Sequence, residues 1–88
     1  MFHLPDYVTW KLSDGEVVIF DHRTGRFYGL NASASVIWQV IAHGGSSDEA
    51  IKQLTNMPGA PPTDRVKGTV QSFVDKCRKE GWISDAVD

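Results

Sequence analysis

The sequence contains a single cysteine, Cys77, among its 88 residues. One thiol cannot form a disulfide within the chain or build a cysteine-rich metal site. The histidines His3, His22 and His43 are far apart, and no HxxxH, CxxC or paired acidic motif accompanies them. The sequence therefore gives no support to a metal centre or a catalytic site, and we expect neither a cofactor nor an enzyme.

Positive charge is not in excess, and long apolar runs are absent. Nine Lys and Arg residues stand against eleven Asp and Glu residues, so the formal net charge is −2. A chain of this charge lacks the bulk attraction to phosphate backbones that nucleic-acid binders use. No stretch approaches the ~20 apolar residues of a membrane span, and residues 1–6 lack the basic and apolar regions of a signal peptide. We therefore expect a cytoplasmic protein with no membrane partner, and nucleic acid is disfavoured.

The composition is that of a folded domain. Hydrophobic residues make up 41% of the chain and charged residues 23%, and aromatic residues are plentiful. A disordered segment has too little apolar surface to fold, which is not the case here. A chain of this length has room for one small core. The sequence therefore predicts a single domain over residues 1–88.

Three short segments have the β-branched and aromatic content of strands, and two turn signals separate them. Residues 7–12 lead to an Asp14-Gly15 step, which is a strong hairpin signal. Residues 16–21 form a continuous apolar run, which predicts a central strand with both faces buried. After a turn at residues 22–25, the third strand is expected over residues 26–30. The result is a three-stranded antiparallel sheet.

Two helical segments follow the strands. Asn31 is a favourable N-cap for a helix over residues 32–42, and Gly44 is placed to end that helix in the left-handed conformation. Ser46 and Glu49 have the spacing of a capping box, which predicts a short second helix to about residue 56. The two helices bury their apolar faces on the same core.

The last third of the chain predicts a loop, a long helix and a short tail. Three prolines in residues 57–62 exclude a helix there. The third helix begins at Thr63 and ends at Gly81, Trp82-Ile83 folds back on the core, and residues 84–88 are expected to fray. Its apolar stripe consists of Val66, Val70, Phe73, Val74 and Cys77. Three strands followed by three helices predict an α+β fold of the winged helix-turn-helix type.

The pattern of these residues resembles the PqqD-like family. The match consists of the third strand, its junction with the first helix, the spacing within the first two helices, and the Gly-aromatic-Ile ending of the last helix. The residues are Gly25, Tyr28, Leu30, Asn31, Ala34, Ile37, Trp38, Ile41, Gly44, Ser46, Glu49, Ala50, Leu54, Gly81 and Ile83. The resemblance spans nearly the whole chain. Residues 4–10 are in addition similar to the stand-alone leader-binding proteins of lasso-peptide pathways.

This resemblance implies a non-catalytic adaptor. Proteins of this family recognise the leader segment of ribosomally made precursor peptides and present the precursor to modifying enzymes, such as a leader protease or a cyclase. The resemblance further implies that the leader adds as a strand along the third strand, with side chains in a groove beside the last helix. The implied contact residues are Arg26, Phe27, Tyr28, Gly29 and Leu30 on the strand and Val66, Thr69, Val70, Phe73 and Lys76 on the helix.

Several of these residues have ordinary structural interpretations as well. Gly29 is open to interpretation as a point of close approach for a peptide backbone, as a bulge, or as relief of crowding. Phe73 lies on the apolar stripe and is expected to pack in the core, and Lys76 is expected to be solvated. Thr69 and Lys76 lie on one flank of the last helix and Lys67 and Arg78 on the other. The sequence does not decide which flank faces the strand.

A winged-helix DNA-binding protein is the main alternative, because fold does not dictate function. The basic residues that it would use are Arg65, Lys67, Arg78 and Lys79 on the last helix and His22, Arg23 and Arg26 near the second turn. Acidic residues interrupt that helix and the net charge is negative, so the sequence favours a peptide over DNA. A third alternative is a structural subunit of a larger complex, which would not bind a free leader.

Overall fold

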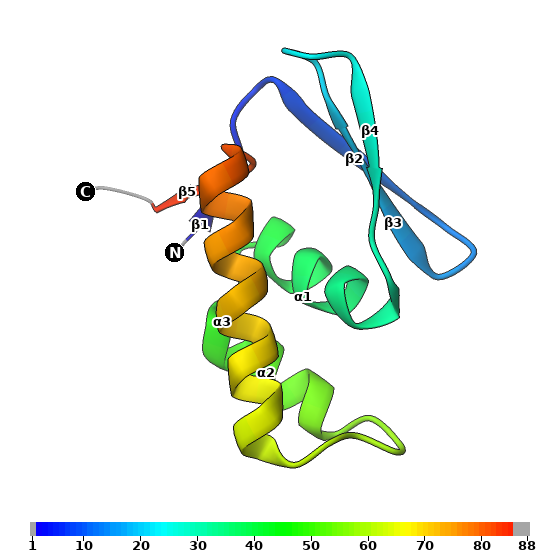
Figure 1. Ribbon diagram of the computed structural model, residues 1–88, viewed down its shortest axis with the longest axis vertical. Coiled ribbons are helices and arrows are strands. Elements are labelled where there is room, and N and C mark those ends of the chain that lie inside the picture. Colours follow the sequence, from blue (N-terminus) through cyan, green and yellow to red (C-terminus); the bar gives the residue numbers. More distant parts are fainter. Residues whose placement is uncertain (1, 86–88) are drawn as a thin grey trace.

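The computed structural model describes residues 2–85. Its main sheet has three antiparallel strands in the order β2-β3-β4, namely Val8–Ser13, Glu16–Asp21 and Arg26–Gly29 (Figure 1). The helices α1, α2 and α3 follow at Ala32–Ala42, Ser47–Thr55 and Thr63–Glu80. The predicted α+β fold, with a three-stranded sheet followed by three helices, is therefore confirmed.

The hairpin between β2 and β3 forms as its turn residues predict. Asp14 and Gly15 have positive φ angles of 52° and 81°, which a two-residue turn of the type I′ class requires. The turn pairs Ser13 with Glu16 and sets the register along both strands. Asp14 adopts this conformation although it is not a glycine, because aspartate and asparagine tolerate it better than other residues do.

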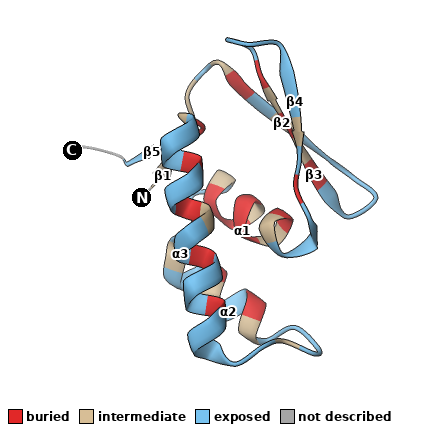
Figure 2. Ribbon diagram, viewed as in Figure 1, coloured by how far each residue is buried: buried red, intermediate tan, exposed pale blue. Residues whose placement is uncertain are grey.

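The central position of β3 is confirmed, but the expectation that both its faces are buried is wrong. Val17 and Ile19 are fully buried, whereas Val18 and Phe20 on the opposite face are partly exposed (Figure 2). The helices lie on one side of the sheet, with α1 packed against β3. The apolar run of β3 therefore includes an outer face that no helix covers.

The helix caps follow the sequence signals. Asn31 Oδ1 accepts a hydrogen bond from the Ala34 N–H at 2.9 Å, and Ser46 Oγ accepts one from the Glu49 N–H at 3.2 Å. Each bond satisfies a backbone donor that the first turn of a helix leaves free. Gly81 ends α3 with φ of 79°. Such caps fix where β4 ends and α1 begins, and so position the edge of the sheet.

A two-stranded ribbon joins the ends of the chain. Strands β1, Phe2–His3, and β5, Ser84–Asp85, pair antiparallel. The expectation of a frayed segment is therefore wrong for Ser84 and Asp85, while its last three residues, 86–88, lie outside the described part. Arg78 on α3 helps to hold the ribbon, because its guanidinium contacts the Asp85 carboxylate at 3.0 Å. Strands of two residues are too short to show an alternating pattern in the sequence.

The core lies between the sheet and the three helices. Val66, Val70, Val74 and Cys77 are buried along α3 as the stripe predicts, and Phe73 is half-buried. Trp82 and Ile83 fold back on the core as expected. The largest fully buried side chains are Trp38, Trp82, Ile19, Ile37 and Ile41. Within the described residues, no helix is long and apolar enough to span a membrane.

Ser35 is a buried polar residue that connects α1 to the sheet. Its hydroxyl accepts a hydrogen bond from the Val17 N–H at 2.8 Å and donates one to the Leu30 carbonyl at 3.3 Å. The hydroxyl thus bridges β3 and the residue that follows β4. Because Ser35 is fully buried, no solvent is available to replace it.

We expect Ser35→Ala to lower the free energy of unfolding by about 1–3 kcal/mol, because the buried Val17 N–H and Leu30 carbonyl lose their partner. Urea unfolding followed by circular dichroism measures the change. Ser72→Ala, at an exposed position of α3, is the matched control and should shift stability by less than about 0.5 kcal/mol. Equal stability of the Ser35 variant and the wild type would show that the bridge contributes nothing.

Candidate functional site: the open edge of strand β4

Strand β4 lies at the edge of the sheet, since it pairs with β3 on one side only. Its register is continuous, with Ile19 opposite Tyr28 and Phe20 opposite Phe27. An edge strand presents unpaired backbone N–H and C=O groups and is therefore a template for another strand. The edge that the sequence predicts for residues 26–30 is present, although the strand itself ends at Gly29.

The pairing pattern shows which backbone groups are free. The Leu30 N–H donates to the Val17 carbonyl at 2.9 Å, so Leu30 and Val17 occupy a hydrogen-bonded position of the ladder, although Ser35 takes the place of the second bond. In antiparallel strands such pairs alternate with pairs that are not bonded. Tyr28 therefore bonds to Ile19, two residues along. The N–H and C=O groups of Phe27 and Gly29, which fall between these pairs, point away from β3 toward the open edge.

The side chains of β4 alternate between the two faces of the sheet. Tyr28 shares the inner face with Ile19, and its ring packs against Trp82 with 4.8 Å between centroids. Phe27 lies on the outer face, where its ring is 4.6 Å from that of Phe20 and 71% of its surface is exposed. Gly29 is on the same outer face. A peptide strand added at this edge would place alternate side chains beside Tyr28 and beside Phe27.

Leu30 differs from its neighbours in the predicted site. Its side chain is buried in the core, its N–H bonds to Val17, and its carbonyl accepts from Ser35. Both backbone groups are thus used within the chain. Leu30 supports the end of the edge from beneath, as its core position in the sequence pattern suggests.

The two flanks of α3 face different neighbours. Arg78 contacts Asp85 of the terminal ribbon, so its flank faces β5. Thr69, on the opposite flank, lines a pocket together with Ser33 in the first turn of α1, directly after the end of β4. Figure 1 shows the ribbon on one side of α3 and β4 on the other. The flank that carries Thr69 and Lys76 is therefore the one that faces the open edge, a point that the sequence left undecided.

The predicted α3 residues are not equally accessible. Only 2% of the Val66 surface and 1% of the Val70 surface are exposed. Phe73 is half-buried, and Thr69 and Lys76 are exposed. The core interpretation of Phe73 is thus correct in part, since it packs against the core cluster and keeps an accessible side. Its position between Thr69 and Lys76 places that side on the flank toward the edge.

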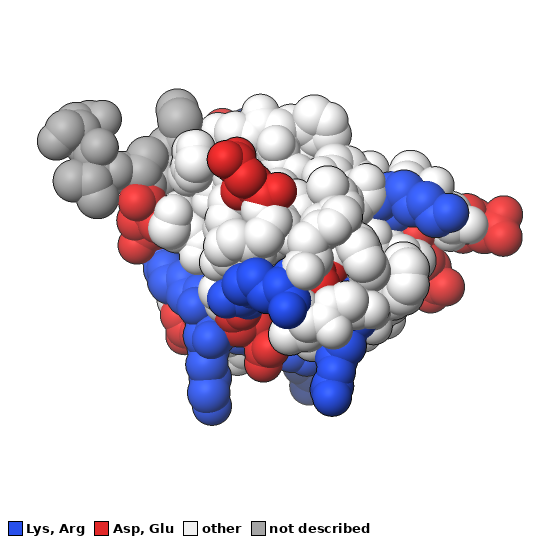
Figure 3. All heavy atoms as spheres, turned by 90° about the horizontal axis from the view of Figure 1, so that it is seen from above, with Lys and Arg blue, Asp and Glu red and all other residues white. Residues whose placement is uncertain are grey.

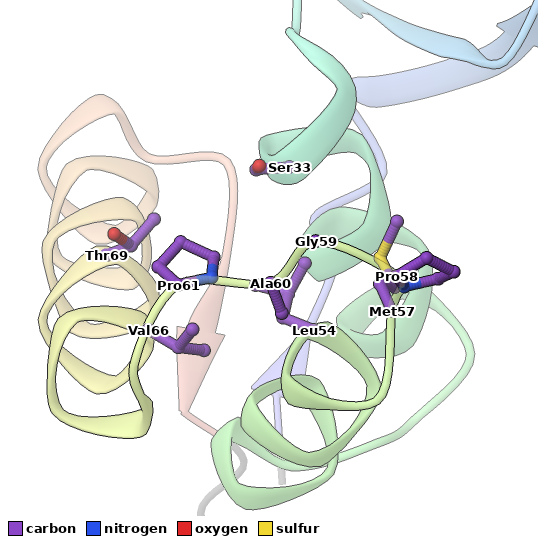
Figure 4. Close-up of a pocket in the computed structure, with 9 residues that line it drawn as sticks. All are labelled: Ser33, Leu54, Met57, Pro58, Gly59, Ala60, Pro61, Val66 and Thr69. Atoms are coloured by element: carbon purple, nitrogen blue, oxygen red, sulfur yellow. The ribbon is translucent and has the colours of Figure 1, made fainter.

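A pocket of about 160 Å³ lies between the start of α1 and the first half of α3 (Figure 4). The loop that joins α2 to α3 forms much of its wall. The lining residues are Ser33, Leu54, Met57, Pro58, Gly59, Ala60, Pro61, Val66 and Thr69. The family resemblance implied Val66 and Thr69 as contact residues, whereas the proline-rich loop was expected only to connect two helices. Its exposed Met57 beside three prolines is the signal that could have indicated a partly apolar wall.

A cluster around Arg23 joins the second turn to the end of α3. The Arg23 side chain binds the buried carboxylate of Asp21 with bonds of 3.1 and 2.8 Å and donates to the Glu80 carbonyl at 2.8 Å. Its guanidinium lies over the Tyr7 ring at 4.0 Å, and the Tyr7 hydroxyl donates to the Gly81 carbonyl. The hydrogen bonds that Arg23 donates to Asp21 hold the pKa of Asp21 below its usual value. The cluster ties the sheet to α3 beside the edge strand.

The same contacts bear on the DNA-binding alternative. Arg23 is bound to Asp21, and Arg78 is bound to Asp75 and Asp85, so both guanidinium groups have partners within the chain. On the face seen in Figure 3, basic and acidic side chains are interspersed and no single basic patch forms. A phosphate-binding surface needs several unpaired basic groups close together. The geometry does not favour DNA as the ligand.

Catalytic groups are not gathered at the edge. Burial raises the pKa of the Cys77 thiol to about 12, so the thiol is protonated at neutral pH and is a poor nucleophile. The thiol is fully buried on α3, as the stripe predicts. Among residues 2–85 there is no cluster of His, Cys, Asp and Glu that could hold a metal ion. What the edge offers is backbone pairing and a partly apolar flank.

Comparison with known proteins identifies the family and the fold. The family model described as coenzyme PQQ synthesis protein D (PqqD) matches residues 16–83. Two solved structures share the fold: TbiB1 in complex with the TbiA(beta) leader peptide, at 22% identity and a TM-score of 0.84, and lasso peptide synthetase B1 complexed with the leader peptide, at 21% and 0.82. They cover 97% and 96% of this chain, and 98% of their own chains is matched in each case. A comparison with curated protein sequences found no match.

Fold and edge together define a small α+β domain with an open strand beside a helix. The chain belongs to the PqqD family, because the family model covers most of its length, from the first residue of β3 to Ile83. The resemblance seen in the sequence is therefore confirmed.

Proposed function

We propose that the chain is a non-catalytic adaptor that binds the leader segment of a ribosomally made precursor peptide. The leader adds as a strand to β4, and the adaptor presents it to modifying enzymes, a leader protease or a cyclase, in lasso-peptide-type biosynthesis in the cytoplasm. The observation that carries the proposal is the outward orientation of the Phe27 and Gly29 backbone groups on an edge strand beside α3. Both structural neighbours are complexes with a leader peptide, which supports the same ligand class.

Backbone pairing alone does not give useful affinity. Phe27 and Gly29 offer two donors and two acceptors, and each hydrogen bond contributes about 0.5–1.5 kcal/mol net. Ordering a disordered peptide costs about 2–5 kcal/mol, which offsets most of that gain. Side-chain contacts must supply the remainder and the specificity.

The side-chain contacts fall on the inner face of the extended sheet. A peptide residue opposite Tyr28 has its side chain on the Tyr28 side, toward the helices, whichever way the added strand runs. There it meets the flank of α3 on which Phe73 is half-buried and Thr69 and Lys76 are exposed. Lys76 suits an acidic leader residue. Arg26, Leu30, Val66 and Val70 complete the proposed contact region, the last three as its buried support.

Phe73→Ala should weaken leader binding about tenfold, because the Phe73 ring supplies apolar contact on the peptide-facing flank. A fluorescein-labelled synthetic leader, taken from the precursor encoded beside this gene, reports binding by fluorescence anisotropy. Phe2→Ala is the matched control, since Phe2 is also half-buried but lies on the opposite flank near Arg78. Equal losses in the two variants would place the contact elsewhere.

The wild-type measurement tests the proposal itself. Saturable binding at micromolar protein or tighter is the expected result. No binding of the leader under these conditions would refute the adaptor function and leave a structural subunit as the alternative. Strong, salt-dependent retention of duplex DNA would instead support the DNA-binding alternative.

A further inference from the structure

Gly29 has no structural reason to be a glycine in the free protein. It pairs with Val18 in a regular ladder, so no bulge is present, and it is not among the glycines with positive φ. A Cβ built at this position would meet no atom within 4 Å, so crowding does not exclude a side chain either. Glycine weakens a strand interior relative to residues that prefer the extended conformation. Neither a bulge, a positive φ angle nor crowding therefore explains this glycine within the free protein.

A hollow on the sheet surface lies where a side chain of residue 29 would stand. Its lining comes from the end of β4, the neighbouring stretch of β3, and the tip of the hairpin between β2 and β3. The residues are Ser13, Asp14, Glu16, Val17, Val18, Gly29, Leu30 and Asn31. The half-buried Val18 is the cross-strand neighbour of Gly29 and gives the hollow an apolar floor. Asp14 and Glu16 are exposed at its rim, and neither is in an ion pair within residues 2–85.

An added strand brings a side chain to this place. The Gly29 N–H and C=O groups point toward the open edge, so a peptide residue pairs directly with Gly29. Paired residues on adjacent strands carry their side chains on the same face of a sheet. The side chain of the residue that faces Gly29 therefore lies on the outer face, next to the hollow and beside Val18.

We propose that this hollow is a subsite for one large side chain of the bound peptide, with an apolar body and no negative charge. Gly29 is then a specificity-determining residue, because any larger residue at this position fills the space that the ligand side chain uses. Val18 supplies the apolar contact, and the carboxylates of Asp14 and Glu16 repel an acidic side chain. This inference rests on the proposed strand addition at β4, and it adds a second point of recognition on the face opposite α3.

Gly29→Val tests the subsite, because valine suits a strand and adds bulk only on the outer face. The variant should keep or raise the Tm of the wild type and bind the labelled leader about tenfold more weakly. Gly68→Val is the matched control, since Gly68 is also exposed with no atom within 4 Å of a built Cβ, but lies on α3. This control should bind the leader with wild-type affinity.

The facing peptide residue can be found by cross-linking. In Gly29→Cys the new thiol is at the edge, whereas Cys77 is buried and unreactive. Leaders with a single cysteine at successive positions should form a disulfide most readily from the residue that faces position 29, since paired Cα atoms lie within disulfide range. A leader with glycine at that residue should bind Gly29→Val as tightly as it binds the wild type, and one with glutamate there should bind the wild type more weakly than the native leader.

The outcomes separate this inference from the proposed function. If the wild type does not bind the leader, strand addition itself fails. If the wild type binds and Gly29→Val binds the native leader equally well, leader binding stands and the subsite is refuted. A loss in Gly29→Val that persists with the glycine-substituted leader would also overturn the subsite, because the loss would then come from the backbone and not from competition for the hollow.

Discussion

Phe27→Pro is expected to weaken leader binding about 100-fold, which corresponds to the loss of at least one hydrogen bond and a clash at the edge. The Phe27 N–H points toward the open edge, so proline removes a donor that the sheet does not use. The ring of the introduced proline also projects toward the added strand. Proline is tolerated on an edge strand where the N–H faces solvent, so the variant should still fold. Fluorescence anisotropy with the labelled leader measures the change.

Two controls separate the backbone from the side chain. Phe27→Ala removes the same ring and keeps the N–H, and it should lose much less affinity than the proline variant. Tyr28→Pro removes an N–H that bonds within the sheet, so it should lower the Tm. If Phe27→Pro folds normally and binds the leader with wild-type affinity, the peptide does not add to β4.

The second large effect concerns Arg23. We expect Arg23→Ala to lower the Tm by at least about 5 °C, because Asp21 is 2% exposed and loses the partner of its buried carboxylate. The variant also loses the bond to the Glu80 carbonyl that ties the sheet to α3. Thermal unfolding by circular dichroism measures the shift. Arg65→Ala, an exposed arginine of α3, should leave the Tm within about 2 °C of the wild type.

The same cluster predicts how stability depends on pH. The Arg23 side chain lowers the pKa of Asp21 in the folded protein below the value of 3.8 that applies to the unfolded chain. The ionised carboxylate therefore stabilises the fold fully above about pH 4, and this contribution is lost as the pH falls through the lowered pKa. Asp21→Asn should be less stable than the wild type at pH 6, and the difference should shrink below pH 4. If the difference in stability between the two proteins stays constant from pH 6 to pH 2, the charge of Asp21 does not stabilise the fold.

Much of the fold follows from local signals. Asp14-Gly15 specifies a two-residue turn, and Asn31 and Ser46 start helices through side-chain bonds to the next turn. Such signals act within four residues and are visible in the sequence. They place the start of α1 correctly, while β4 ends at Gly29, before the predicted end at Leu30. The family resemblance then identified β4 as the edge to consider.

What the sequence did not give depends on contacts between distant segments. The outer face of β3 is apolar yet lacks a covering helix, and a run of apolar residues carries no information on how many layers lie on it. The ribbon of Phe2–His3 and Ser84–Asp85 is too short for a periodic pattern. Arg23 was considered as a phosphate contact, whereas it binds Asp21 two residues before it and the end of α3.

The proposed site remains a prediction, and the structure narrows the backbone groups that it could use. The alternation of hydrogen bonds reduces five candidate strand residues to two, Phe27 and Gly29, whose backbone groups are free. The contact of Arg78 with Asp85 and the pocket that Thr69 shares with Ser33 place the Thr69 flank of α3 on the side of β4. Both facts depend on register and packing, which a single sequence does not encode in a local pattern.

Amide hydrogen exchange by NMR tests strand addition most directly. In the free protein the amides of Phe27 and Gly29 should exchange quickly, while that of Tyr28, bonded to Ile19, should be protected. Saturation with the leader should slow exchange at Phe27 and Gly29 at least about tenfold and change Tyr28 little. If the leader binds and the exchange of Phe27 and Gly29 stays as fast as in the free protein, the peptide does not pair with β4 and the central proposal is wrong.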